Sequence, residues 1–111
     1  MRIIDTGITK EILSGDNHPQ LKIGDKLYTV DDRQSTFDKI QDLQNNSELN
    51  EADKTRQIYE LALGKEATDE IMGMDLPVQK NIYLSYCVMG AITGEDPEEL
   101  QKMAKERMSK N

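Results

Sequence analysis

The sequence predicts a small α+β protein that is mainly α, with a short N-terminal β-hairpin packed on four or five helices. Near residue 33 the spacing of apolar residues changes from about two to nearly four, which is the change from strand to helix. Turn and capping residues then divide the rest of the chain into segments of helical length. At 111 residues the chain has the usual size of one domain, so we expect a single domain over 1–111.

The first part of the chain is predicted as an arm followed by the hairpin. Residues 1–19 form an N-terminal arm whose apolar residues suit either a strand or an irregular segment. The hairpin occupies residues 20–31, where two short strand-like runs flank Gly24-Asp25-Lys26, a sequence typical of a short turn. A hairpin is only marginally stable alone, so its apolar face should pack on the helices.

The helical part is predicted over residues 33–110. Caps and apolar spacing predict five helices. The first covers about 34–45, the second runs from Asn50 or Ser47 to Gly64, and the third is a short segment with Ala67, Ile71 and Met74 on one face. The fourth covers about 77–92, and the fifth begins at Asp96. The last start is well marked, since Asp96-Pro97-Glu98-Glu99 combines a capping side chain, a proline in the first turn and early carboxylates.

The helix over about 77–92 is expected to be the most buried, because its apolar residues wrap most of the way round. We assign its core face to Val78, Ile82, Tyr86 and Met89, which recur every three or four residues. Tyr83 lies off that face. The core as a whole should be small and aliphatic, since hydrophobic residues make up 36% of the chain.

Charge and hydropathy indicate where the protein works. The net charge of −7 opposes binding to a nucleic-acid backbone or an anionic membrane, so we expect neither as a partner. No run approaches the ~18 apolar residues of a membrane span, and the first residues lack the apolar run of a secretory signal. We therefore expect a cytoplasmic protein.

The residue inventory offers little for catalysis. A zinc site needs at least three nitrogen or sulfur ligands, and the chain has one histidine and one cysteine. His18 is interpreted as a solvated turn residue and Cys87 as a buried, inert thiol. Acidic pairs such as Asp31-Asp32 fit helix starts, and Gly90-x-x-x-Gly94 fits a helix end better than a phosphate loop. We expect that the protein is not an enzyme and that it binds neither a metal ion nor a cofactor.

Protein binding is the remaining class of function. Methionine and tyrosine side chains adapt to varied partners, and a thin core can leave apolar surface for self-association. The residues that we expect to bind a partner are Tyr83, Leu100, Met103 and Met108.

Three segments give the sequence a family resemblance: Ile23-Gly24-Asp25-Lys26-Leu27-Tyr28-Thr29-Val30, Ala62-Leu63-Gly64-Lys65-Glu66-Ala67 and Ala91-Ile92-Thr93-Gly94-Glu95-Asp96. In the order and type of its elements, over roughly residues 20–108, the chain resembles the small tail assembly chaperones of long-tailed (siphovirus-type) phages and prophages of Gram-positive bacteria. The N-terminal twenty residues lie outside this resemblance.

The resemblance implies a chaperone that covers the helices of the tape measure protein before the tail tube polymerises, in the cytoplasm of the bacterial host. It also implies short and frameshifted long forms, and self-association in some members. An alternative from another class is an acidic regulator or inhibitor that occludes a basic site on a host protein. Neighbouring tail tube and tape measure genes would distinguish the two.

Overall fold

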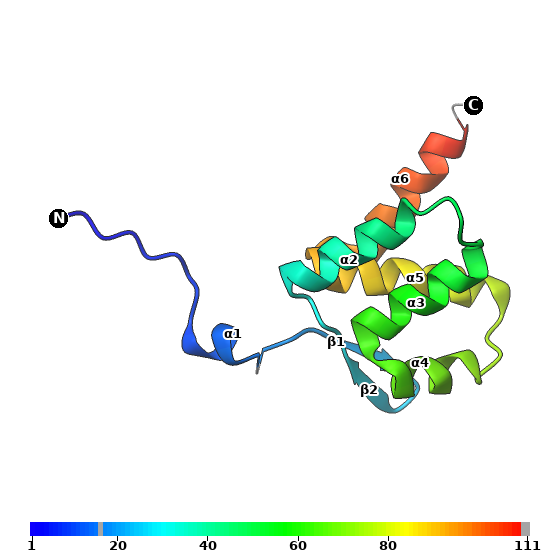
Figure 1. The fold of residues 1–111 in the computed structure, drawn as a ribbon, viewed down its shortest axis with the longest axis horizontal. Coiled ribbons are helices and arrows are strands. Elements are labelled where there is room, and N and C mark those ends of the chain that lie inside the picture. The colour runs from blue at the N-terminus through cyan, green and yellow to red at the C-terminus, as the bar shows by residue number, and fades with distance from the viewer. Residues whose placement is uncertain (16, 110–111) are drawn as a thin grey trace.

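The computed structural model describes residues 1–15 and 17–109, and side chains up to Arg107. Within these residues the chain forms six helices and one two-stranded hairpin (Figure 1), which confirms the predicted α+β, mainly α fold. The elements in chain order are α1 (Lys10–Ser14), β1 (Gln20–Ile23), β2 (Lys26–Thr29), α2 (Gln34–Gln44), α3 (Glu51–Leu63), α4 (Lys65–Met72), α5 (Val78–Thr93) and α6 (Pro97–Ser109).

The hairpin forms where it was predicted. β1 and β2 are antiparallel, with Leu21 opposite Tyr28, and Gly24 supplies the positive φ of 61° that the tight turn requires. A further hydrogen bond, from the amide of Val30 to the carbonyl oxygen of Pro19 at 2.9 Å, continues the pairing. The Glu70 carboxylate of α4 accepts hydrogen bonds from Lys26 Nζ and the Tyr28 hydroxyl, so the hairpin is tied to the helices.

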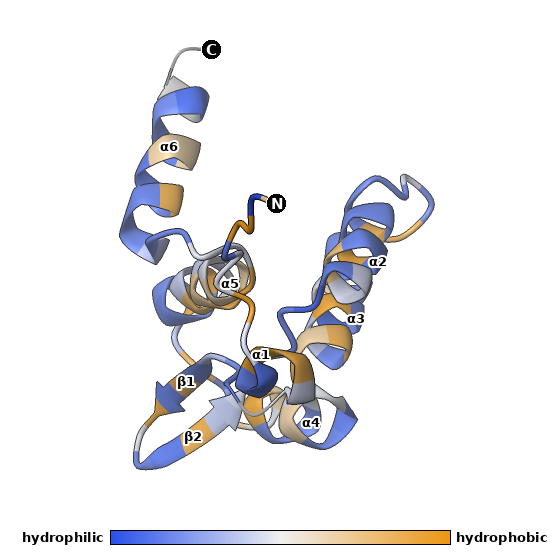
Figure 2. Cartoon of the chain, turned by 90° about the vertical axis from the view of Figure 1, so that its left-hand side faces the viewer, coloured by the Kyte–Doolittle hydropathy of each residue, from blue (hydrophilic) through white to orange (hydrophobic). Residues whose placement is uncertain are grey.

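Two walls of helices rise from a base made by the hairpin and α4. Figure 2 shows α2 and α3 on one side and α5 and α6 on the other. The closest packing is between helices that follow one another in sequence, α2 with α3, α3 with α4, and α5 with α6, while α5 also contacts α3 and β1. The buried hydrophobic residues come from both walls and the base: Tyr28, Val30, Ile40, Tyr59, Ala62, Ile71, Leu84 and Val88.

Most predicted helix ends are confirmed. Asn50, rather than Ser47, caps α3, since its side chain accepts a hydrogen bond from the Asp53 amide at 2.8 Å. The Asp96 carboxylate accepts one from the Glu98 amide at 2.9 Å, just before α6. The third predicted helix is shorter than expected, because α4 ends at Met72 and Met74 follows it in the connection to α5.

The predicted core face of α5 is wrong in its first half, although Met89 at its other end packs against the core. The residues that α5 buries are Leu84, Val88 and Gly90, whereas Val78 is 74% exposed and Ile82 47% exposed. Only its second part is enclosed, since residues 78–82 are all exposed and residues 83–92 are all buried or half-buried. The polar run 79–81 keeps the first turn in water, so the helix is not buried along its length.

Gly90 brings the end of α5 close to the start of α6. A Cβ atom at this position would lie 2.6 Å from the backbone oxygen of Glu95 and 3.1 Å from the ring of Pro97. The predicted helix end is real but belongs to Gly94, which adopts the left-handed conformation with φ 81°. Gly90 therefore serves close packing, a role that the sequence interpretation did not assign.

The N-terminal arm packs little against the rest of the protein. Residues 1–14 are all exposed, and α1 is a single five-residue helix that buries none of its residues. Thr9 caps it at one end and Gly15, with φ 80°, ends it. The arm is thus neither the predicted strand nor wholly irregular.

Candidate functional site

The exposed face of α5 is the main candidate for a binding site. Val78, Ile82, Tyr86 and Met89 follow one another at helical spacing, and we call them the α5 stripe. The first two are exposed and the last two half-buried. A helix that leaves such a row uncovered presents an apolar surface of the kind that another helix can cover.

Two grooves border the α5 stripe. One, of about 430 Å³, lies between α5 and α6 and is lined by Gln79, Lys80, Ile82, Tyr83, Gln101 and Lys105. The other, of about 290 Å³, lies between α5 and α3; Ile58 and Tyr59 line it from α3, Tyr86 and Met89 from α5. Ile82 therefore opens toward α6, whereas Tyr86 and Met89 open toward α3.

Three of the four predicted binding residues have described side chains. Tyr83 is half-buried in the α5–α6 groove. On α6, Leu100 is half-buried and Met103 is 44% exposed. Met108 belongs to α6, but its side chain lies outside the described residues. Tyr83 is therefore next to the α5 stripe, because Ile82 lines the same groove.

Tyr83 and Cys87 share one environment beside α6. Burial raises the pKa of the Tyr83 hydroxyl, and the neighbouring Cys87, Glu98 and Asp96 raise it further. Burial likewise raises the pKa of the Cys87 thiol, and Tyr83 lowers it in part. The thiol is half-buried, not fully buried as expected. Its raised pKa disfavours the reactive thiolate, in keeping with the predicted inertness.

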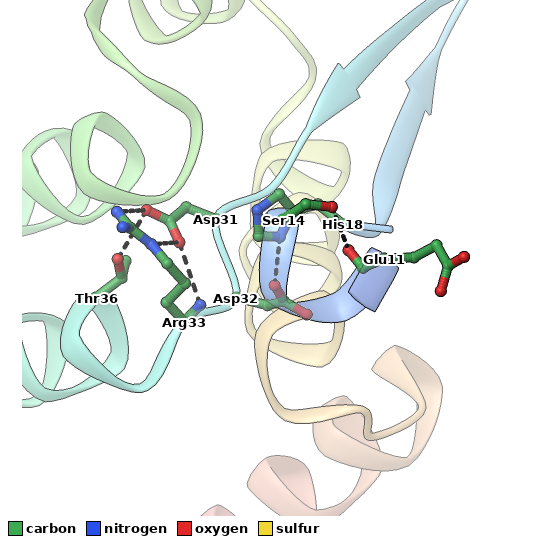
Figure 3. Close-up of polar contacts among 7 residues, drawn as sticks. All are labelled: Glu11, Ser14, His18, Asp31, Asp32, Arg33 and Thr36. Atoms are coloured by element: carbon green, nitrogen blue, oxygen red, sulfur yellow. Dashed lines mark hydrogen bonds and ion pairs between the residues drawn. The ribbon is translucent and has the colours of Figure 1, made fainter. Parts of the chain in front are cut away.

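The acidic pair after the hairpin is split between two separate contacts. Figure 3 shows the carboxylates of Asp31 and Asp32 pointing to opposite sides of the chain. Asp31 accepts hydrogen bonds from Arg33 Nε at 2.9 Å and from Thr36 Oγ1 at 2.9 Å. Asp32 lies 2.6 Å from Nδ1 of His18, which is half-buried and paired, so the expectation of a solvated His18 is wrong. These contacts join the hairpin to α2 and the arm.

Replacing Asp31 with asparagine should lower the unfolding free energy by about 1–2 kcal/mol at neutral pH, because hydrogen bonds to a charged group are lost. The hydrogen bonds from Arg33 hold the pKa of Asp31 far below its ordinary value. Such a group stabilises the fold above the pKa of the unfolded chain, about 4, and loses its contribution as pH falls toward the folded-state pKa. Urea unfolding over a pH series should show that the difference in unfolding free energy between Asp31→Asn and wild type shrinks below about pH 4.

The exposed Asp42 of α2 provides the matched control for this measurement. Asp42→Asn should leave the unfolding free energy at neutral pH close to that of wild type. If Asp31→Asn lowered the unfolding free energy by the same amount at every pH, the charged contact with Arg33 would not be the source of the stability.

Among the described residues, no group of three or more His, Cys, Asp or Glu side chains lies close enough together to hold a metal ion. No helix in the described part of the chain is long and apolar enough to cross a membrane.

Val78 and Ile82 were predicted as core residues but lie at the surface. The signal was present in the first turn of α5, where Gln79, Lys80 and Asn81 form a polar run between them. Three successive polar residues point in most directions around a helix, so this turn cannot be enclosed on all sides.

Fold and site together define a mainly helical α+β protein with an apolar helix face that is uncovered at Val78 and Ile82. No protein-family model, curated protein or solved structure matches the chain.

Proposed function

We propose that this protein is a phage tail assembly chaperone that binds helices of the tape measure protein before the tail tube polymerises, in the cytoplasm of the bacterial host. The observation that carries the proposal is the α5 stripe, which keeps apolar side chains at helical spacing in contact with water. The resemblance of the sequence to this family supplies the partner.

The chemistry of the stripe suits such a partner. A tape measure helix exposes long apolar rows until the tube encloses it, and uncovered rows aggregate. A second helix lying along the α5 stripe would place anchors every three or four residues against Val78, Ile82 and Tyr86. Tyr83 extends this surface toward α6, in the groove that Gln101 and Lys105 line. Leu100 and Met103 of α6 are not among the residues that line this groove, so their contact with the partner is a separate part of the proposal.

Charge adds a preference for one kind of helix. Lys80 and Lys105 line the groove beside Ile82, and no acidic residue is among its described lining residues, although Glu98 and Asp96 act on the Tyr83 hydroxyl nearby. A partner helix with carboxylates flanking its apolar row would meet these lysines favourably. The net charge of −7 keeps the loaded chaperone from associating non-specifically.

The direct test is binding of full-length protein to tape measure fragments from the same phage genome. Ile82→Asp should weaken binding at least about tenfold, because it places a charge within the apolar contact. Its melting temperature should stay near that of wild type, since Ile82 is 47% exposed. Co-purification and fluorescence anisotropy measure the binding.

Leu27→Asp on the hairpin is the matched control, since Leu27 is 54% exposed and lies in β2, outside the α5 stripe. It should bind tape measure fragments like wild type. Equal binding by Ile82→Asp and wild type would remove the stripe from the interface. Failure of the wild-type chain to bind any fragment would reject the chaperone function. Binding to a basic host protein instead would favour the acidic inhibitor.

A further inference from the structure

The N-terminal arm carries a second set of uncovered apolar side chains. The exposed fractions of the isoleucine and leucine side chains within residues 1–13 range from 50% at Ile12 to 88% at Ile3. The large aliphatic residues concerned are Ile3, Ile4, Ile8, Ile12 and Leu13. Ile12 and Leu13 line a groove beside the end of α3, yet they remain at least half exposed. So many exposed aliphatic side chains in one short segment indicate a surface that something covers.

Part of this segment is already helical. The turn formed by α1 has a capping threonine and a glycine end, but it buries no residue. Helices this short are not stable in water without packing. An apolar surface laid against α1 would stabilise it and could extend it toward the N-terminus.

The spacing and charges of the segment match the α5 stripe. Ile4, Ile8 and Ile12 recur every four residues, as do Val78, Ile82 and Tyr86. As a helix, the segment would carry its isoleucines in one row. Asp5 and Glu11 would flank that row on opposite sides, so one of the two carboxylates would face Lys80 and Lys105 in the α5–α6 groove.

Geometry favours a second copy over the same molecule. Figure 1 shows the arm leading away from the body that holds α5. Two acidic bodies repel each other, but residues 1–13 hold two basic and two acidic residues, so the net charge of −7 falls on the rest of the chain. This neutral segment can approach the acidic body of another copy without that repulsion.

We propose that residues 4–13 of one copy dock as a helix on the α5 stripe of a second copy. The arm then protects the stripe and competes with the partner helix for it. The inference uses the surface named in the proposed function but does not depend on the identity of the partner there.

Sedimentation equilibrium of full-length protein over a micromolar concentration series tests the docking. Wild type should form dimers. The double variant Ile4→Asp/Ile8→Asp and the single variant Ile82→Asp should each raise the dimer dissociation constant at least about tenfold. Leu27→Asp should dimerise like wild type. Thermal unfolding of each variant verifies folding, which exposed positions should preserve.

Mixing identifies the two surfaces as partners. The arm variant keeps an intact α5 stripe and the Ile82 variant keeps an intact arm, so an equal mixture should form heterodimers that neither forms alone. A monomeric wild type, an arm variant that dimerises normally, or a mixture without heterodimers would each overturn the docking. If dimerisation behaves as expected while tape measure binding fails, the proposed function alone is rejected.

Discussion

Ile40→Ala should lower the unfolding free energy by about 2–5 kcal/mol, whereas Ile82→Ala should change it by less than about 0.5 kcal/mol. Both positions are isoleucines in helices, so the chemical change is the same. Ile40 is 0% exposed within the core, and Ile82 is 47% exposed on the α5 stripe. The loss at Ile40 combines the transfer of methylene groups with the cavity that they leave.

Urea unfolding of both variants, with unchanged dependence on denaturant, measures this difference. Val88→Ala provides a second core comparison on α5 itself, since Val88 is also 0% exposed. A loss at Ile82 as large as that at Ile40 would return Ile82 to the core and remove the candidate site.

Gly90→Ala should destabilise the protein by about 1–3 kcal/mol, the usual cost of forcing extra volume into a packed region. In an ordinary helix interior the same change stabilises by up to about 1 kcal/mol, because alanine is the better helix former. The sign is reversed here because the new Cβ would lie 2.6 Å from the Glu95 backbone oxygen and 3.1 Å from Pro97. A backbone oxygen cannot move aside as a flexible side chain can.

Gly73→Ala is the matched control. Gly73 caps α4 with an ordinary φ of −73°, and a Cβ there would lie 3.3 Å from its nearest neighbour, the Asp69 oxygen. Its melting temperature should stay close to wild type. Stabilisation by Gly90→Ala would show that α6 can move away from α5 at little cost.

The fold class was predictable because local signals agreed. The hairpin turn, the Asn50 cap and the Asp96-Pro97 start each depend on residues adjacent in sequence. Such signals determine where an element begins and ends. They carry no information about which face a later element covers.

The candidate site was only partly predictable for that reason. Apolar spacing marked the α5 stripe correctly as a row but could not tell whether another element covers it. The structure packs α5 through Leu84 and Val88 instead. Tyr83, which was predicted because it stood off the expected core face, lies in the groove beside Ile82. The pairing of His18 with Asp32 joins residues from separate segments and has no local signature.

The packing of successive helices on one another has a consequence for how the chain folds. Because α2 packs on α3, α3 on α4 and α5 on α6, most native contacts close short loops. Proteins dominated by such contacts reach the native state quickly, in microseconds to milliseconds. Fewer contacts join α5 to α3 and β1, so we expect amide hydrogen exchange in α5 and α6 to report a lower opening free energy than in α3.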